Sequence, residues 1–208
     1  MEFKIIVVGI GPGAKEYVVP LAIDTIDKAK VLVGGKRALS EFSHEGQMTF
    51  AIKADIKAVM DFVAENLKSS DVVVMVSGDP GYYSLLSALR RNFSVDKIKV
   101  IPGLSSVQVA FAKIALPWQE ASLLSFHGRI PSEEELIYHE GRIIGMLTDK
   151  KFSSAKIAKY LLERNWAKTA RAYICSRISY EDEKIISLSL EEASKMEDTA
   201  SCVMIVEG

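Results

Sequence analysis

Short apolar runs alternate with amphipathic segments through the first half of the chain. The runs, rich in valine and isoleucine, cover residues 3–9, 30–34, 71–77 and 97–103. Segments with a helical spacing of apolar residues lie at 20–29, 53–68, 81–92 and 104–115. This alternation predicts parallel strands joined by helices. Because the strands are apolar on both faces, we expect helices on both sides of the sheet.

The pattern changes after Leu116. Strand-like runs follow one another with shorter gaps, at 121–126, 142–147, 170–176, 184–190 and 201–207. One helix is expected at 153–164, capped by Ser153 or Ser154. The segment between 176 and 184 is too short for a crossover helix, which indicates antiparallel pairing. We therefore predict two α/β domains, 1–116 with a mostly parallel sheet and 117–208 with a mixed sheet, and an active site in the cleft between them.

A glycine-rich loop, G-I-G-P-G at 9–13, follows the first predicted strand. Together with Ala14 it satisfies the dinucleotide fingerprint, and Lys36 or Arg37 stands where an NADP 2′-phosphate would be met. A pyrophosphate, however, needs the loop to open directly onto a helix N-terminus, and the helical segment here begins only at Pro20. Further glycine loops follow other strands, at 34–35, 77–81 and 102–106. Either these glycines only permit tight turns, or the loops meet at the carboxyl edge of the sheet and bind a ligand.

Charge and composition exclude several classes of protein. The chain has 26 basic and 27 acidic residues, so its net charge of −1 gives no general attraction to nucleic acid or membranes. No apolar run approaches the ~20 residues that cross a bilayer, and the N-terminus lacks the layout of a signal peptide, so we expect a cytoplasmic protein. Cys175 and Cys202 stand alone, without the spacing of metal ligands, and are expected to be buried thiols.

Several motifs together resemble the tetrapyrrole methylases. They are GIGPG at 9–13, VGGKRAL at 33–39, SGDPGYYS at 77–84, IPGLSSVQVAFA at 101–112, and LPW followed by SFHGR at 125–129. The resemblance is greatest to the branch that methylates C-5 of the corrin ring in cobalamin biosynthesis. It implies a homodimeric methyltransferase that acts on a cobalt-precorrin with S-adenosylmethionine folded into the interdomain cleft. Fused relatives also methylate C-15 with decarboxylation, so that activity is expected in a separate partner.

The same resemblance implies roles for individual residues. Contacts to S-adenosylmethionine are expected from Pro12, Gly78, Asp79, Tyr82, Ser105, Ser106, Leu147 and Ala200. Substrate contacts are expected from Gly11, Lys36, Arg37, Tyr83, His127 and Arg129. A corrin precursor carries several carboxylates, and the planar fork of arginine suits carboxylates. The basic residues of this second set are therefore expected to form a rim around the ring, and His127 is also the candidate general base.

Turn and capping chemistry leaves alternatives for three of these positions. Asp79 could cap a helix that starts near Gly81, one of Ser105 and Ser106 could cap the next helix, and His127 could be an ordinary loop histidine. Alternatives also exist for the function. They are methylation of another ring position, of a protein or of ribosomal RNA, an NADP-dependent oxidoreductase, and a subunit that only carries the corrinoid intermediate.

Overall fold

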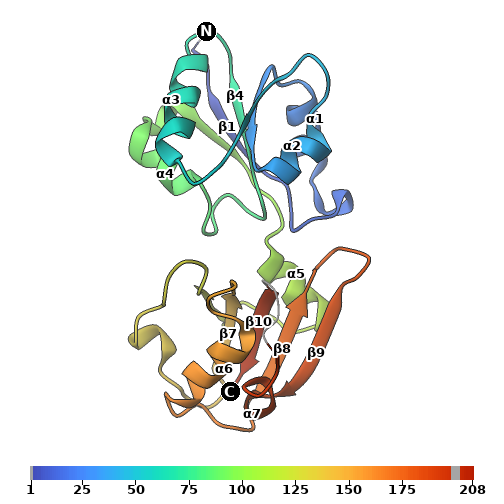
Figure 1. The fold of residues 1–208 in the computed structure, drawn as a ribbon, viewed down its shortest axis with the longest axis vertical. Coiled ribbons are helices and arrows are strands. Elements are labelled where there is room, and N and C mark those ends of the chain that lie inside the picture. Colours follow the sequence, from blue (N-terminus) through green and yellow to red (C-terminus); the bar gives the residue numbers. More distant parts are fainter. Residues whose placement is uncertain (1, 198–201) are drawn as a thin grey trace. The chain divides into compact units, whose positions relative to one another are not determined.

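The chain forms two compact units, Met1–Ser105 and Ser106–Gly208, in a computed structural model that describes residues 2–197 and 202–208. Figure 1 shows their elements in sequence colours. Each unit has its own sheet and its own hydrophobic core. Both units combine a sheet with helices, so the predicted α/β class is confirmed.

The first unit contains a five-stranded parallel sheet in the order β3-β2-β4-β1-β5. Its strands are β1 (Ile5–Gly9), β2 (Val31–Gly34), β3 (Met48–Ala51), β4 (Val72–Val76) and β5 (Ile98–Ile101). Its helices are α1 (Pro20–Asp27), α2 (Lys36–Phe42), α3 (Ile56–Asn66) and α4 (Leu86–Asn92), with short 3-10 turns η1 (Lys15–Tyr17) and η2 (Val95–Lys97). The parallel sheet confirms the prediction for this half of the chain.

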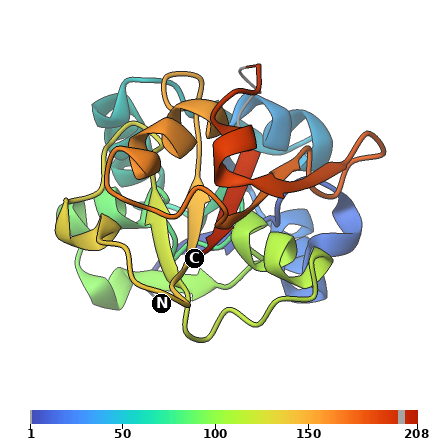
Figure 2. The ribbon, with the colours of Figure 1, turned by 90° about the horizontal axis from the view of Figure 1, so that it is seen from below.

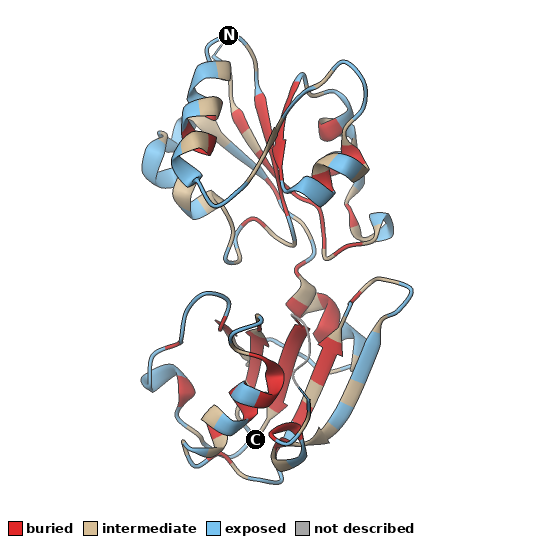
Figure 3. Cartoon of the chain, in the orientation of Figure 1, coloured by how far each residue is buried: buried red, intermediate tan, exposed pale blue. Residues whose placement is uncertain are grey.

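Helices cover both faces of this sheet, as the apolar strands require. On one face, Ala22 and Ile26 of α1 pack with Val8 of β1 and Met75 of β4. The opposite face packs against α3 and α4, which lie on the other side of the sheet from α1 and α2 (Figure 1). All five residues of β4 are buried, and Figure 3 shows the buried core of the sheet in red. Because the apolar strand residues are buried on both faces of the sheet, helices cover both of its sides.

The second unit contains a mixed five-stranded sheet in the order β6-β7-β10-β8-β9. Its strands are β6 (Ser122–Ser125), β7 (Ile143–Leu147), β8 (Arg171–Ser176), β9 (Lys184–Ser189) and β10 (Cys202–Glu207). Its helices are α5 (Ser106–Lys113), α6 (Ser154–Leu162) and α7 (Leu190–Ala193), with the 3-10 turn η3 (Glu134–Leu136). Among the strand pairs of the described residues, β6–β7 is parallel and the other pairs of this sheet are antiparallel. Figure 2 shows these strands from a second direction, and the mixed sheet is as predicted.

Helix α5 belongs to the second unit because it packs on β7 and β10. A Cβ atom added to Gly145 of β7 would lie 2.7 Å from Cε2 of Phe111 and 3.2 Å from Cγ1 of Val107, both on α5. The absence of a side chain at Gly145 thus allows α5 to pack closely against β7. The division between the units falls before α5, at Ser105, whereas the sequence pattern placed it after residue 116.

The structure contains elements that the apolar pattern did not predict. These are α2, α7 and β3. Strand β3 lies at the edge of the sheet with Met48 exposed, and α7 is a single turn, so neither carries a strong periodic signal. Helix α4 begins at Leu86, later than the predicted start at residue 81. The expected cap of α6 is confirmed, since the Ser153 hydroxyl accepts from the Lys156 N–H at 3.4 Å.

Candidate functional site

Three glycine loops meet at the carboxyl edge of the first sheet, where β1, β4 and β5 end. A Cβ atom on Gly9 would lie 2.6 Å from the carbonyl oxygen of Gly78 and 2.7 Å from the nitrogen of Gly103. A Cβ atom on Gly103 would lie 2.8 Å from the carbonyl carbon of Gly9. Real Cβ contacts are not this short, so each position requires glycine. The predicted convergence of the loops is therefore present in the structure.

The first loop is joined to the loop after β4 by backbone hydrogen bonds. The Gly78 N–H donates to the carbonyl of Gly11 at 2.8 Å, and the Ile10 N–H donates to that of Val76 at 3.0 Å. Gly11 and Gly78 have φ values of 68° and 71°, in the left-handed region that glycine tolerates. After this loop the chain forms η1, and α1 begins only at Pro20. The loop therefore does not open onto a helix N-terminus, which argues against a phosphate cradle.

The carboxylate of Asp79 joins two of these loops. Its Oδ1 accepts from the Gly81 N–H at 2.7 Å and its Oδ2 accepts from the Gly103 N–H at 3.0 Å. The alternative role as a helix cap is wrong, because α4 begins at Leu86 and its cap position is Leu85. Asp79 instead fixes the loop after β4 to the loop after β5, which is a positioning role at the predicted site.

The two tyrosines that follow have different environments. Tyr82 is half-buried, and this burial raises the pKa of its phenol. Tyr83 is 46% exposed with φ of 48°, an uncommon conformation for an aromatic residue. Their rings meet edge to face with centroids 4.7 Å apart. Tyr82 is thus the more buried of the two tyrosines and Tyr83 the more exposed.

Other predicted residues of the first unit lie near the same edge. Lys36 and Arg37 begin α2, directly after β2, and both are exposed. Arg37 also forms a weak ion pair with Glu41, at 4.0 Å between Nη1 and Oε2. Ser105 is 5% exposed and lies beside Gly78, since a Cβ on that glycine would be 3.5 Å from the Ser105 Cα. Pro12 lies in the loop between Gly11 and η1.

In the second unit, His127 and Arg129 lie on the loop that follows β6, and both are exposed. Gly128 between them has φ of 68° and donates its N–H to Oδ2 of Asp149 at 2.8 Å. Asp149 is not among the predicted site residues. The signal that could have identified it is its position in the loop two residues after the end of β7, because an aspartate in such a loop often accepts hydrogen bonds from backbone N–H groups.

The remaining predicted residues lie at or near the boundaries of elements. Ser106 is the first residue of α5, and Leu147 is the last residue of β7 and is half-buried. Beside it, Thr148 Oγ1 accepts from the Cys202 N–H at 2.8 Å, which joins the ends of β7 and β10. Ala200 lies outside the described residues. The site residues therefore form two groups, one in each unit, and the predicted cleft between the units stays a prediction.

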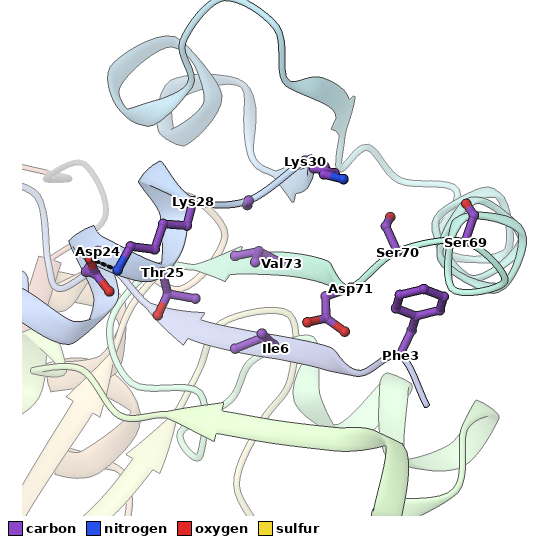
Figure 4. Close-up of a pocket in the computed structure, with 11 residues that line it drawn as sticks. Phe3, Ile6, Asp24, Thr25, Lys28, Lys30, Ser69, Ser70, Asp71 and Val73 are labelled. Carbon is purple, nitrogen blue, oxygen red and sulfur yellow. Dashed lines mark ion pairs between the residues drawn. The ribbon is translucent and has the colours of Figure 1, made fainter. Parts of the chain in front are cut away.

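A cavity of about 390 Å³ lies at the opposite end of the first sheet (Figure 4). Its lining includes Ile6 of β1, Asp71 just before β4, and Lys28, which pairs with Asp24 at 2.6 Å between Nζ and Oδ1. None of the residues described as lining it is a predicted site residue. The cavity lies at the amino ends of the strands, so the glycine loops do not form it.

Within 2–197 and 202–208, no group of three or more His, Cys, Asp and Glu side chains could hold a metal ion. Cys175 and Cys202 are both buried, as predicted, and burial raises the pKa of the Cys175 thiol to about 12. No helix in the described part of the chain is long and apolar enough to span a bilayer.

Comparison with known proteins identifies relatives over almost the whole chain. The family model for Tetrapyrrole (Corrin/Porphyrin) Methylases matches residues 4–194. A cobalt-precorrin-7 C(5)-methyltransferase of Salmonella typhimurium is 36% identical over 158 residues, covering 76% of this chain and 77% of the relative. A probable enzyme of the same name from Methanocaldococcus jannaschii is 29% identical and covers 98% of both chains.

The fold is also found among solved structures. Uroporphyrin-III C-methyl transferase from Thermus thermophilus, complexed with S-adenosyl homocysteine, superposes with a TM-score of 0.73. The match covers 98% of this chain and 91% of that protein, at 18% sequence identity. At this identity the comparison establishes a common fold.

Proposed function

Because the chain belongs to the tetrapyrrole (corrin/porphyrin) methylase family, we propose that it is an S-adenosylmethionine-dependent C-methyltransferase of cobalamin biosynthesis that methylates C-5 of a cobalt-precorrin. The observation that carries the proposal is the meeting of three glycine loops through their backbone atoms at the carboxyl edge of the first sheet. Ligands bind at this edge in open α/β folds. The choice of C-5 rests on the name of the Salmonella relative.

The loops at this edge fit S-adenosylmethionine, which offers an ammonium, a carboxylate and ribose hydroxyls to polar groups. Gly78 adopts its left-handed conformation beside the buried Ser105, so backbone atoms and a small hydroxyl form much of this surface. We assign Gly78, Ser105, Pro12 and Tyr82 to cofactor contacts, with Ser106 and Leu147 from the second unit. When bound, the cofactor supplies a methyl group that its sulfonium has already activated.

With an activated methyl group, the main task of the protein is alignment. Correct placement of donor and acceptor can lower a barrier by ~7–11 kcal/mol. The backbone contacts between Gly9 and Gly103, and the Asp79 carboxylate that joins two loops, favour such alignment because they hold the loops rigidly. His127 is the candidate to accept a proton from the methylated ring, since histidine is the side chain that acts most often as a general base.

We assign Lys36, Arg37, His127 and Arg129 to the carboxylates of the substrate. All four side chains are exposed and stand at strand ends or helix starts, where they can reach a large anionic ligand. Replacing Arg129 by alanine removes a charge-assisted hydrogen bond and should raise the KM for cobalt-precorrin about tenfold, an effect of ~1.4 kcal/mol. Steady-state kinetics with Arg91→Ala as an exposed control tests this. A KM for cobalt-precorrin that is unchanged in Arg129→Ala would contradict the assignment.

The first experiment distinguishes the methyltransferase from an NADP-dependent oxidoreductase. The purified protein is titrated by calorimetry with S-adenosylhomocysteine and, separately, with NADPH. We expect micromolar binding of S-adenosylhomocysteine and none of NADPH, because the first glycine loop lacks the helix that a pyrophosphate needs. Mass spectrometry should then show the gain of one methyl group on cobalt-precorrin-7. If the protein bound NADPH and did not bind S-adenosylhomocysteine, the proposal would be rejected.

The proposal includes a setting for the enzyme. We propose that it works in the cytoplasm, where S-adenosylmethionine is made, and as a homodimer. The methylation at C-15 is assigned to a separate partner enzyme. Light scattering of the purified protein tests the dimer, and a monomer at micromolar concentration would contradict it.

A further inference from the structure

Asp149 bridges two loops at the carboxyl ends of the parallel strands β6 and β7. Its Oδ2 accepts from the Gly128 N–H at 2.8 Å, on the loop after β6. Its Oδ1 accepts from the N–H groups of Lys151 and Phe152, at 2.8 and 2.7 Å, on its own loop. One carboxylate therefore fixes the conformation of the segment that carries His127 and Arg129.

Polar contacts hold this segment in place. A Cβ atom on Gly128 would meet nothing within 4 Å, so its φ of 68°, and not a close neighbour, accounts for the glycine at this position. The Phe126 N–H donates to the carbonyl of Leu147 at 2.8 Å, and the His127 N–H donates to the Ser125 hydroxyl at 3.2 Å. These bonds anchor the start of the loop. Beyond them, the hydrogen bond from the Gly128 N–H to Asp149 orients the turn.

We propose that Asp149 is a positioning residue for substrate recognition, which holds the loop so that His127 and Arg129 together meet a carboxylate of the substrate. The inference rests on the proposed function and adds to it a residue that would not touch the ring. Two exposed side chains on a free loop would lose conformational entropy when they bind. A loop already fixed by Asp149 loses less, which is the benefit of preorganisation.

The geometry requires aspartate at this position. Both carboxylate oxygens face N–H donors, and an asparagine offers one acceptor oxygen and one amide donor. Either orientation of an asparagine side chain therefore places its NH₂ group against an N–H and breaks the connection to one of the two loops. The carboxylate also lies close enough to His127 for their charges to interact. Arg129 likewise interacts with the charge of Glu135, so acidic groups accompany both basic residues.

The test compares wild type with Asp149→Asn in the methylation of cobalt-precorrin-7. We expect the KM for the precorrin to rise about tenfold, equivalent to ~1.4 kcal/mol, and the Kd for S-adenosylhomocysteine to stay within about twofold. The control is Asp182→Asn, which removes an exposed carboxylate that pairs with Arg177 in the turn after β8. An unchanged KM, or an equal weakening of S-adenosylhomocysteine binding, would overturn the proposal.

A second variant reaches the same loop by another route. Gly128→Ala strains the left-handed turn without a steric clash and should also raise the KM. Because both substitutions release one loop, the double variant should be little worse than either single variant, and full additivity would contradict the mechanism. A stable corrin polycarboxylate, cobyrinic acid, should bind wild type better than its methyl ester, and Gly128→Ala should reduce that preference. If wild type does not bind S-adenosylhomocysteine, the proposed function itself fails.

Discussion

At the scale of single residues, the candidate site consists of glycines, which have no side chain, and of an aspartate whose carboxylate oxygens both accept hydrogen bonds from backbone N–H groups. Gly9 and Gly103 contact each other through main-chain atoms, and no Cβ fits between them. Asp79 uses both carboxylate oxygens to join backbone groups on two loops. The surface offered to a ligand is therefore built mainly by rigid backbone.

This arrangement predicts the effect of Asp79→Asn. An amide can accept only one of the two hydrogen bonds, which leaves the other N–H unsatisfied at a cost of ~1–3 kcal/mol. We expect the free energy of unfolding to fall by about this amount in urea denaturation, and the Kd for S-adenosylhomocysteine to rise at least about tenfold. Asp61→Asn, which removes an exposed carboxylate paired with Lys57, is the matched control. Equal cofactor affinity in the two variants would show that Asp79 does not shape the site.

At the scale of elements, the carboxyl ends of parallel strands bring the functional loops together in both units. In the first unit β1, β4 and β5 end beside one another, and in the second unit β6 and β7 do so. Helix α5 starts immediately after the loop that contains Gly103 and Ser105. Its packing on β7, through Val107 and Phe111 against Gly145, fixes the place of α5 within the second unit.

The close approach of α5 to β7 can be tested with Gly145→Ala. The added methyl group would overlap Phe111, and overpacking of this kind costs ~1–3 kcal/mol. We expect a corresponding loss in the urea midpoint, partly restored by adding Phe111→Leu. Gly35→Ala, where an added Cβ meets nothing within 4 Å and φ is −60°, should cost less, and only through the weaker N-cap that alanine gives to α2. A neutral Gly145→Ala would mean that α5 can move away without cost.

At the scale of the whole molecule, the two units differ in the ionic groups on which they depend. Among the described residues, most carboxyl groups whose pKa is lowered by hydrogen bonds or ion pairs lie in the second unit. They are Glu133, Glu135, Asp149, Glu183 and Glu192, whereas Asp96 lies in the first unit. The first unit also contains His44, whose pKa is raised chiefly by its hydrogen bond to the Asp27 carbonyl.

These shifts predict that acid destabilises the second unit first. A carboxyl group with a lowered pKa contributes its full stability above its ordinary value, 3.8 for Asp149 and 4.5 for Glu183, and loses it as the pH falls further. The raised pKa of His44 acts in the opposite sense, since its contribution is complete below the ordinary value of 6.5.

Tryptophan fluorescence can follow the second unit, because both tryptophans of the chain, Trp118 and Trp166, lie in it. Trp166 is buried and reports unfolding of that core. Below pH about 4, the change in Trp166 fluorescence should come at a higher pH than the loss of the circular dichroism signal that the first unit contributes. A single coincident transition would show that the two units unfold together.

The sequence alone determined the alternation of strands and helices and the change from a parallel to a mixed sheet, because apolar periodicity records which faces are buried. It also identified the family and placed the start of α1 at Pro20. It did not predict β3, whose exposed edge position gives no such pattern, and the domain boundary that it favoured lies beyond α5. Only the tertiary structure decided the roles of Asp79 and Asp149. Their backbone partners, Gly103 and Gly128, lie 24 and 21 residues away along the chain, and only the folded sheets bring them within hydrogen-bond distance.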